Sequence, residues 1–201
     1  MKKLLLIAAV MIISVTASFA QLGVRMGMNF GGLNKDYEKT GYGEEKTSIG
    51  LHLGVVDNFE LGSGISIQPG VYYTQKNWKF ENKNGDWKAR THHLEVPVLI
   101  KYNLELGDIT IDPHVGPYFD LAFAGKFKDH DLKIYRKSKE NKPSLDFSNF
   151  DMGLTLGCGA TYSDIVYFGL DYQFGFKDIA NNKNLETRSH VFMITFGVWF
   201  N

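Results

Sequence analysis

Cysteine, net charge and long apolar segments are scarce in this sequence. The 201 residues include one cysteine, Cys158, so no internal disulfide and no cysteine-based metal site can form. The formal net charge is zero, whereas nucleic-acid-binding proteins need a basic surface. After residue 20, no apolar run approaches the roughly 20 residues that a membrane-spanning helix requires. These absences argue against disulfide-rich scaffolds, nucleic-acid-binding proteins and helical membrane proteins.

The first twenty residues differ from the rest of the chain. Two lysines precede a short apolar run, and Ser18 and Ala20 then place small residues three positions and one position before the expected cleavage site. This order is typical of a secretory signal peptide. No cysteine follows the site, so a lipid anchor is not expected. We predict a signal peptide at residues 1–20 and one mature domain, an outer-membrane barrel, at residues 21–201.

Segments of the mature chain alternate apolar and other residues with a period of two, which is the period of a β-strand. Helical spacing is not evident. Eight strands are predicted, at residues 22–31, 47–57, 64–76, 91–104, 109–124, 150–162, 165–177 and 188–200. Pro97 and Pro117 fall inside predicted strands. We expect bulges at both because proline cannot donate a hydrogen bond to the neighbouring strand.

Charged residues are sorted between the two faces of these strands. No position in the apolar rows is Asp, Glu, Lys or Arg, and the opposite rows hold nine charges. These are Arg25, Lys76, Glu95, Lys101, Asp112, Asp120, Asp151, Asp171 and Lys177. A cation facing lipid costs about 2–4 kcal/mol at the bilayer midplane, and nine such costs would exceed the stability of a typical domain, about 5–15 kcal/mol. The charged rows are therefore predicted to face the inside of a barrel.

Two further patterns favour a membrane barrel over an exported soluble one. Short and long connections alternate along the chain, as in bacterial outer-membrane barrels, and with a periplasmic N-terminus the long ones face outside. The charged rows also hold many glycines among large aromatic residues, as a narrow barrel interior requires, whereas a soluble barrel is apolar inside. The sequence thus predicts an all-β, eight-stranded antiparallel up-and-down transmembrane β-barrel in the outer membrane, surrounded by outer-membrane lipid.

Several segments of the mature chain resemble a known family in their order and spacing. They are His93–Tyr102 (HLEVPVLIKY), Gly116–Phe119 (GPYF), Ala124–Lys126 (AGK), Asp171–Ile179 (DYQFGFKDI) and, more loosely, Gln68–Lys76 (QPGVYYTQK). In these segments the chain is similar to the PorT-like outer-membrane β-barrel proteins of Bacteroidetes. The resemblance implies one barrel in the outer membrane. It suggests a role in protein secretion only by analogy of fold.

Eight residues are candidates for a polar network inside the barrel. They are Arg25, Glu95, Lys101, Asp112, His114, Asp120, Asp151 and Asp171. An eight-stranded interior is about filled by its own side chains, so paired charges that fill it are the main interpretation. A proton relay or a ligand pocket is the alternative. At the C-terminus, Phe196, Val198 and Phe200 are the candidate signal for the barrel-insertion machinery, or simply lipid-facing residues.

No catalytic, cofactor or metal site is expected, and the protein is not expected to be an enzyme. His92 and His93 are adjacent and point to opposite faces of a strand, and no serine lies in a nucleophile-elbow sequence. The loop at residues 125–149 is the best candidate for contact with partners. We expect a structural or interaction role in the cell envelope. An accessory role in a secretion system and a small-ligand binding or transport barrel are the alternatives, with envelope or secretion-system proteins as candidate partners.

Overall fold

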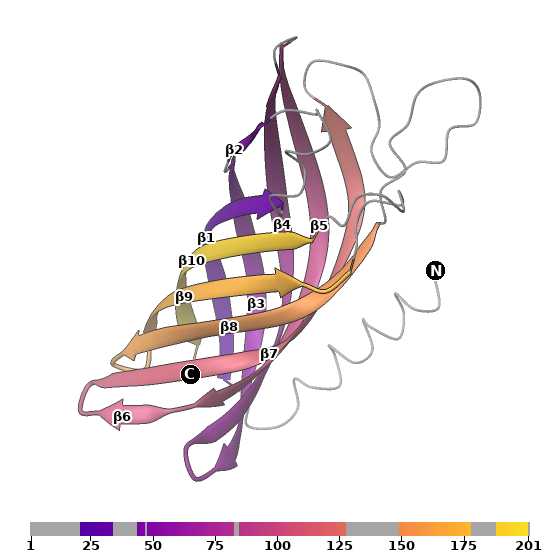
Figure 1. Cartoon of the computed structure of the whole chain (residues 1–201). Coiled ribbons are helices and arrows are strands. Elements are labelled where there is room, and N and C mark those ends of the chain that lie inside the picture. Colours follow the sequence, from indigo (N-terminus) through magenta and orange to yellow (C-terminus); the bar gives the residue numbers. More distant parts are fainter. Residues whose placement is uncertain are drawn as a thin grey trace.

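In a computed structural model, antiparallel strands account for most of the described chain (Figure 1). The structure describes residues 21–33, 44–46, 48–82, 85–127, 149–177 and 188–200. The strands in these ranges are β1 (Gln21–Leu33), β2 (Glu44–Lys46), β3 (Ser48–Gly62), β4 (Ile65–Asn82), β5 (Gly85–Tyr102), β6 (Leu104–Leu106), β7 (Ile109–Phe127), β8 (Phe150–Tyr162), β9 (Val166–Gly175) and β10 (Ser189–Phe200). No helix among these residues has the length and apolar content needed to cross a membrane.

Eight of these strands form a closed ring. In ring order they are β1, β3, β4, β5, β7, β8, β9 and β10, and β10 pairs with β1 to close the sheet. The two short strands lie outside this ring of eight: β2 pairs with the outer part of β4, and β6 pairs with the start of β7. Closure removes the unpaired strand edges that lipid would not tolerate. The predicted eight-stranded antiparallel barrel is confirmed.

The two ends of the barrel differ. At the short-turn end lie the turns at residues 63–64, 107–108 and 163–164, together with the start of β1 and the end of β10. The opposite end is called here the long-connection end. There β4 and β5 pair as far as Asn82↔Gly85, so most of the predicted connection at residues 77–90 is strand. In sequence, Trp78, Phe80, Trp87 and Ala89 still alternate there with charged residues, so the strand pattern was present and the prediction of a connection is wrong over most of this stretch.

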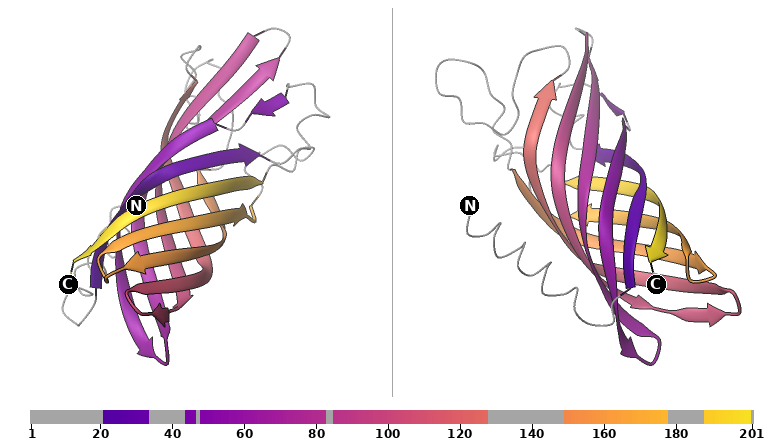
Figure 2. Two further views of the ribbon diagram at one scale, coloured as in Figure 1. Left: turned by 90° about the vertical axis from the view of Figure 1, so that its left-hand side faces the viewer. Right: turned by 180° about the vertical axis from the view of Figure 1, so that it is seen from behind.

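The β4–β5 hairpin projects beyond the rest of the wall (Figures 1 and 2). Each of its strands has 18 residues, and they pair as far as Asn82↔Gly85, whereas the neighbouring β7, with 19 residues, pairs with β5 only as far as Ala89↔Phe127. A transmembrane strand needs about 9–11 residues. The outer part of the hairpin therefore extends past the membrane at the long-connection end.

The prolines inside strands do not produce the expected bulges. The β5–β7 register keeps the same offset from Val96↔Phe119 and Pro97↔Tyr118 to Ile100↔Val115, and the β7–β8 register continues through Pro117↔Leu154. Opposite Pro97 the β4–β5 ladder has a gap but resumes with the same register. The prediction of bulges at Pro97 and Pro117 is wrong, because the loss of a donor interrupts pairing locally without inserting a residue. The register shifts occur instead at His92/His93 and between Glu60 and Gly62.

The side chains are sorted by face, as predicted. Large apolar side chains such as Met26, Leu51 and Phe196 are exposed on the outer face, where lipid would cover them. Eight of the nine charged residues predicted to face inward are buried. Lys177 is the exception: it is exposed, because β9 ends at Gly175 before reaching it. The fold thus places charge on the enclosed axis and apolar surface outside.

Candidate functional site

A buried lysine near the long-connection end holds two carboxylates. Lys76 Nζ of β4 contacts the Asp120 carboxylate of β7 and lies 3.5 Å from Glu95 Oε2 of β5. Asp120 Oδ1 also accepts a hydrogen bond from His93 Nδ1 at 2.6 Å, and Glu95 Oε1 accepts one from Gln173 Nε2 at 2.7 Å. Buried charges are tolerated only when they are paired and hydrogen-bonded. This group, the Lys76 cluster, meets that condition through residues from four strands.

Closer to the short-turn end, Arg25 of β1 lies against aromatic rings. Its guanidinium carbon is 3.1 Å from the ring centre of Tyr167 and 4.6 Å from that of Trp199. Arg25 Nη2 and Lys101 Nζ both donate to Gln68 Oε1, at 3.4 and 3.1 Å. The faces of aromatic rings attract cations. The two positive side chains therefore share one amide oxygen and one pair of rings.

His114 of β7 joins two carboxylates. Its Nδ1 is 3.2 Å from Asp112 Oδ1, and its Nε2 is 2.6 Å from Asp171 Oδ1. Lys101 Nζ is 3.1 Å from the same Asp112 oxygen. Gly157 of β8 leaves room for this arrangement, because a Cβ there would collide with the side chains of both Asp171 and His114. We call the set of Arg25, Lys101, Asp112, His114 and Asp171 the Arg25 cluster.

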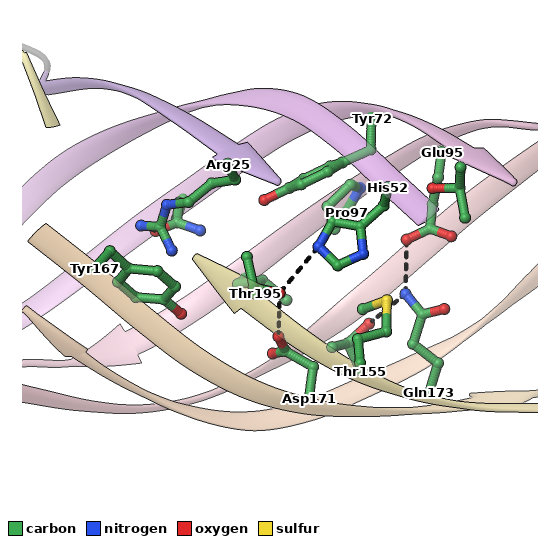
Figure 3. Close-up of a pocket in the computed structure, with 14 residues that line it drawn as sticks. Arg25, His52, Tyr72, Glu95, Pro97, Thr155, Tyr167, Asp171, Gln173 and Thr195 are labelled. Atoms are coloured by element: carbon green, nitrogen blue, oxygen red, sulfur yellow. Dashed lines mark hydrogen bonds between the residues drawn. The ribbon is translucent and has the colours of Figure 1, made fainter. Parts of the chain in front are cut away.

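A chain of polar contacts runs along one side of the interior, from Asp171 of the Arg25 cluster to Asn29 of β1 (Figure 3). Thr195 Oγ1 donates to Asp171 Oδ2 at 3.5 Å, and it lies 3.1 Å from His52 Nε2. His52 Nδ1 is 2.5 Å from Asn29 Oδ1. Residues of β9, β10, β3 and β1 are thereby tied together inside the barrel. The contacts link the inner faces of four strands that are neighbours in the ring.

The structure places all eight predicted network residues inside the barrel but does not join them into one group. Glu95 and Asp120 belong to the Lys76 cluster, and five others form the Arg25 cluster. Asp151 stands apart from both. It accepts hydrogen bonds from Tyr118 Oη at 3.2 Å and from Ser189 Oγ at 3.0 Å.

Ten further inward residues that pair with or surround these groups were not among the predicted network residues. They are Asn29, His52, Gln68, Lys76, His93, Tyr118, Tyr167, Gln173, Thr195 and Trp199. Their inward position follows from strand alternation, so the signal was present in the sequence. The contacts between them depend on the stagger of one strand against the next. The alternation of residues does not reveal that stagger.

A cavity of about 30 Å³ borders both clusters. Its lining includes Arg25, His52, Glu95, Asp171 and Gln173 (Figure 3). That volume is about the share of one water molecule in the liquid. Glu95 and Gln173 line this cavity, and within the described chain their Oε2 and Oε1 atoms have no hydrogen-bond partner. The cavity therefore has polar atoms in its lining. It is large enough for water but too small for a metabolite.

The described part of the chain contains no group of three or more His, Cys, Asp or Glu side chains that could hold a metal ion. Cys158 is exposed on the outer face of β8. The interior therefore offers acid–base pairs and hydrogen bonds, arranged as a packed polar core. These pairs neutralise buried charge, and their side chains fill the space between the walls.

Comparison with known proteins identifies this architecture. A family model described as outer membrane protein beta-barrel domain matches residues 15–181. The fold is similar to OprG from Pseudomonas aeruginosa, with a TM-score of 0.52 and 16% identity over 90% of this chain and 96% of that one. It is also similar to Neisserial surface protein A, with a TM-score of 0.51 and 14% identity over 91% of this chain and 100% of that one. Such low identities show the fold alone. Among curated protein sequences, none matches this chain.

Proposed function

This chain belongs to the outer membrane protein beta-barrel domain family, and on that premise we propose a structural or interaction role in the cell envelope without conduction through the barrel. The observation that supports the proposal is the filled interior. The Lys76 and Arg25 clusters span the lumen, and the cavity between them measures about 30 Å³. A barrel of eight strands is about filled by its own side chains.

Electrical recording tests this proposal. In planar bilayers we expect no steady single-channel conductance from the purified, folded barrel. A double variant, Tyr167→Ala with Trp199→Ala, serves as a comparison, because it removes two rings that pack around Arg25. A porin inserted in the same bilayers shows that conductance would be detected. Steady wild-type conductance would reject a closed lumen and favour the alternative of a transport barrel.

The parts offered to partners are at the long-connection end. The β4–β5 hairpin projects there on a rigid barrel, and loops on rigid scaffolds commonly carry function. The loop at residues 125–149 joins β7 to β8 at the same end, although residues 128–148 lie outside the described residues. We therefore place contacts with envelope proteins at this end.

A second candidate function is that of an accessory in protein secretion. It is supported by the likeness to PorT-like proteins of Bacteroidetes over segments such as His93–Tyr102, in which Glu95 and Lys101 belong to the two interior clusters. Affinity capture from cross-linked outer membranes distinguishes the two roles. Enrichment of secretion components over other envelope proteins supports the accessory role, and their absence from the captured set contradicts it.

Two further proposals concern biogenesis. Residues 1–20 lie outside the described residues, and we propose that they are a signal peptide cleaved after Ala20. A mature protein whose mass shows residues before Gln21 would contradict this. Phe196, Val198 and Phe200 face outward on β10 beside β1. We propose that they form the insertion signal, and unaltered insertion of a Phe200→Ser variant into membranes would count against that role.

A further inference from the structure

Two strands that enter the barrel from its long-connection end carry the same short motif. The first copy is Arg90-Thr91-His92-His93-Leu94, at β5, and the second is Arg188-Ser189-His190-Val191-Phe192, at β10. In both copies the order is arginine, then a serine or threonine, then histidine. A variable residue and a large apolar residue follow. In the ring of eight strands β5 and β10 are four places apart, so the copies lie on opposite sides of the barrel.

The second residue of each motif anchors it to the interior. Thr91 is fully buried, and its Oγ1 donates to the Lys76 carbonyl oxygen at 2.9 Å. Ser189 is 4% exposed, and its Oγ donates to Asp151. Neighbouring residues of a strand point to opposite faces. The residues on either side of each buried hydroxyl residue therefore point outward. These are an exposed arginine and a half-buried histidine in both copies.

In the first copy, the histidine lies between a tyrosine and a phenylalanine. Tyr73 of β4 stacks on His92 with ring centres 5.9 Å apart, and its hydroxyl is 2.6 Å from His92 Nδ1. The ring of Phe123 from β7 is 6.3 Å from that of His92. The register shift at His92/His93 leaves Phe123 as the extra residue of β7, and it is 60% exposed.

The second copy repeats this arrangement with other residues. The rings of Tyr172 and Phe174, both on β9, are each 6.2 Å from that of His190. The two copies thus share a Tyr–His–Phe cluster on the outer face. In the first copy the tyrosine and phenylalanine come from the two strands that flank β5, whereas in the second copy both come from β9. Similar clusters built from different strands indicate a shared requirement at this level of the barrel.

The motif marks the level at which the outer face changes from apolar to polar. On the membrane side of the first copy are Leu94 and its partner Leu121, and on the other side Arg90 pairs with Asn77. In the second copy, Phe192 and Ile194 follow Arg188 in the same order. Aromatic side chains gather at the boundary between hydrocarbon and headgroups in such barrels. Both arginines therefore lie at the level of the lipid headgroups.

Among the residues whose side chains the structure describes, charges outside the interior differ in sign between the two ends of the barrel. Among the charged side chains that the structure describes outside the interior, those toward the short-turn end are acidic and those at the long-connection end are basic. The acidic ones are Asp57, Glu60, Glu105, Asp108 and Asp164, and the basic ones are Arg90, Lys177 and Arg188. Positive charge thus coincides with the headgroup level at the end that carries the long connections.

We propose that each motif binds the phosphate of one lipid headgroup in the outer leaflet, so that the barrel carries two lipids on opposite sides. Arg90 and Arg188 supply the planar, permanently charged group that matches phosphate oxygens. The Tyr–His–Phe clusters form the wall on which the lipid lies below its phosphate. The proposal goes beyond the interaction role proposed above, and it requires only that the long-connection end faces outward.

Native mass spectrometry of the folded protein tests the proposal by counting retained lipids. The probes are dimyristoyl phosphatidic acid and, as the lipid without an exposed phosphate monoester, dimyristoyl phosphatidylcholine. We expect wild type to retain two phosphatidic acid molecules in preference to phosphatidylcholine. Arg90→Gln and Arg188→Gln should each retain one, and the double variant none. Heat-modifiable mobility on gels establishes that each variant is folded.

Lys177→Gln is the matched control, because it removes one positive charge from the same rim outside both motifs. It should retain two lipids. Equal retention of the two probes, two lipids on the double variant, or loss in Lys177→Gln equal to that in the arginine variants would overturn the proposal. Excess inorganic phosphate should leave the lipids bound, since the apolar wall contributes to retention. Displacement by phosphate alone would mean that a free anion, and not a lipid, is the ligand.

Discussion

The interior of this barrel is organised residue by residue around the pairing of buried charge. Three cationic side chains, those of Arg25, Lys76 and Lys101, face five carboxylates, so cations alone cannot serve every acid. Neutral and histidine donors complete the set. His93 and His114 each contact a carboxylate at 2.6 Å, and Asp151 accepts from two hydroxyl groups and the Met152 backbone N–H. Hydrogen bonding, rather than ion pairing alone, makes the charged interior tolerable.

Glu95→Gln should lower the thermal stability of the barrel. Glu95 is 2% exposed and accepts from Gln173 while it faces Lys76. A glutamine can keep the first contact, but its amide group then points donors at the ammonium group. A buried mismatch of this kind costs about 1–3 kcal/mol. Thermal unfolding in detergent measures the change.

Glu105→Gln provides the control for this prediction. Glu105 is exposed in β6 at the short-turn end, and exposed substitutions usually change stability by about 0.5 kcal/mol or less. Its melting temperature should stay at the wild-type value. A Glu95→Gln variant that melts with the wild type would show that Glu95 is not held in a buried network.

At the scale of the element, the β4–β5 hairpin divides into a part within the membrane-spanning wall and a projection beyond it. β4 and β5 have 18 residues each, about twice what a bilayer requires. Their inner parts contribute Lys76, Thr91 and His93 to the interior. Their outer parts, beyond the Asn77↔Arg90 pair, continue the ladder as far as Asn82↔Gly85, and neither cluster as defined above includes a residue from them. Stability should therefore depend on one part of the hairpin and not on the other.

Replacing residues 79–88 by Asn-Gly should shorten the hairpin without unfolding the barrel. Lys79 and Lys88 are paired, so the cut leaves two strands in register, and Asn-Gly favours the tight turn that joins them. We expect the melting temperature to stay close to that of the wild type and the heat-modifiable gel shift to persist.

The longer replacement of residues 76–91 is the informative comparison. Lys76 and Thr91 are also paired, but this cut removes the ammonium group of the Lys76 cluster and leaves Asp120 and Glu95 without it. Leaving buried charges uncompensated costs about 3–5 kcal/mol. If both deletions destabilise the barrel equally, the division of the hairpin into wall and projection is incorrect.

At the scale of the whole molecule, the barrel has polar groups inside and an apolar outer wall. Large apolar residues such as Leu53, Phe123 and Leu156 are more than half exposed. In water this surface would exceed what monomeric proteins leave uncovered, whereas in a bilayer it is matched to the acyl chains. The closed hydrogen-bonded ring and the braced interior make the molecule resistant to partial opening.

Removal of detergent should therefore cause the purified mature protein to associate or precipitate. Light scattering after dilution into plain buffer measures this, and unheated samples in detergent should migrate differently on gels from boiled ones because the closed barrel persists. A protein that stays monomeric without any surfactant would contradict the assignment of its outer face to lipid.

The sequence by itself determined which face each strand residue occupies. A lipid-facing charge is so costly that the rows sort completely, so the barrel, its strand number and the burial of residues such as Arg25 and Asp171 could be predicted. The prediction missed the hairpin beyond Asn77, where Trp78, Phe80, Trp87 and Ala89 continue the alternation, because the polar residues 81–86 interrupt it at the turn. The register at Pro97 was also mispredicted, because a lost donor was taken to require an inserted residue.

Tertiary structure alone decided which inward residues meet. His114 reaches Asp171 from 57 positions away, and Gln173 reaches Glu95 from 78, because ring closure and strand stagger bring them to one depth. The same closure sets Arg90 and Arg188 on opposite walls. A period of two specifies inside or outside but carries no information on height along the axis or on position around the ring. That information exists only once the sheet has closed.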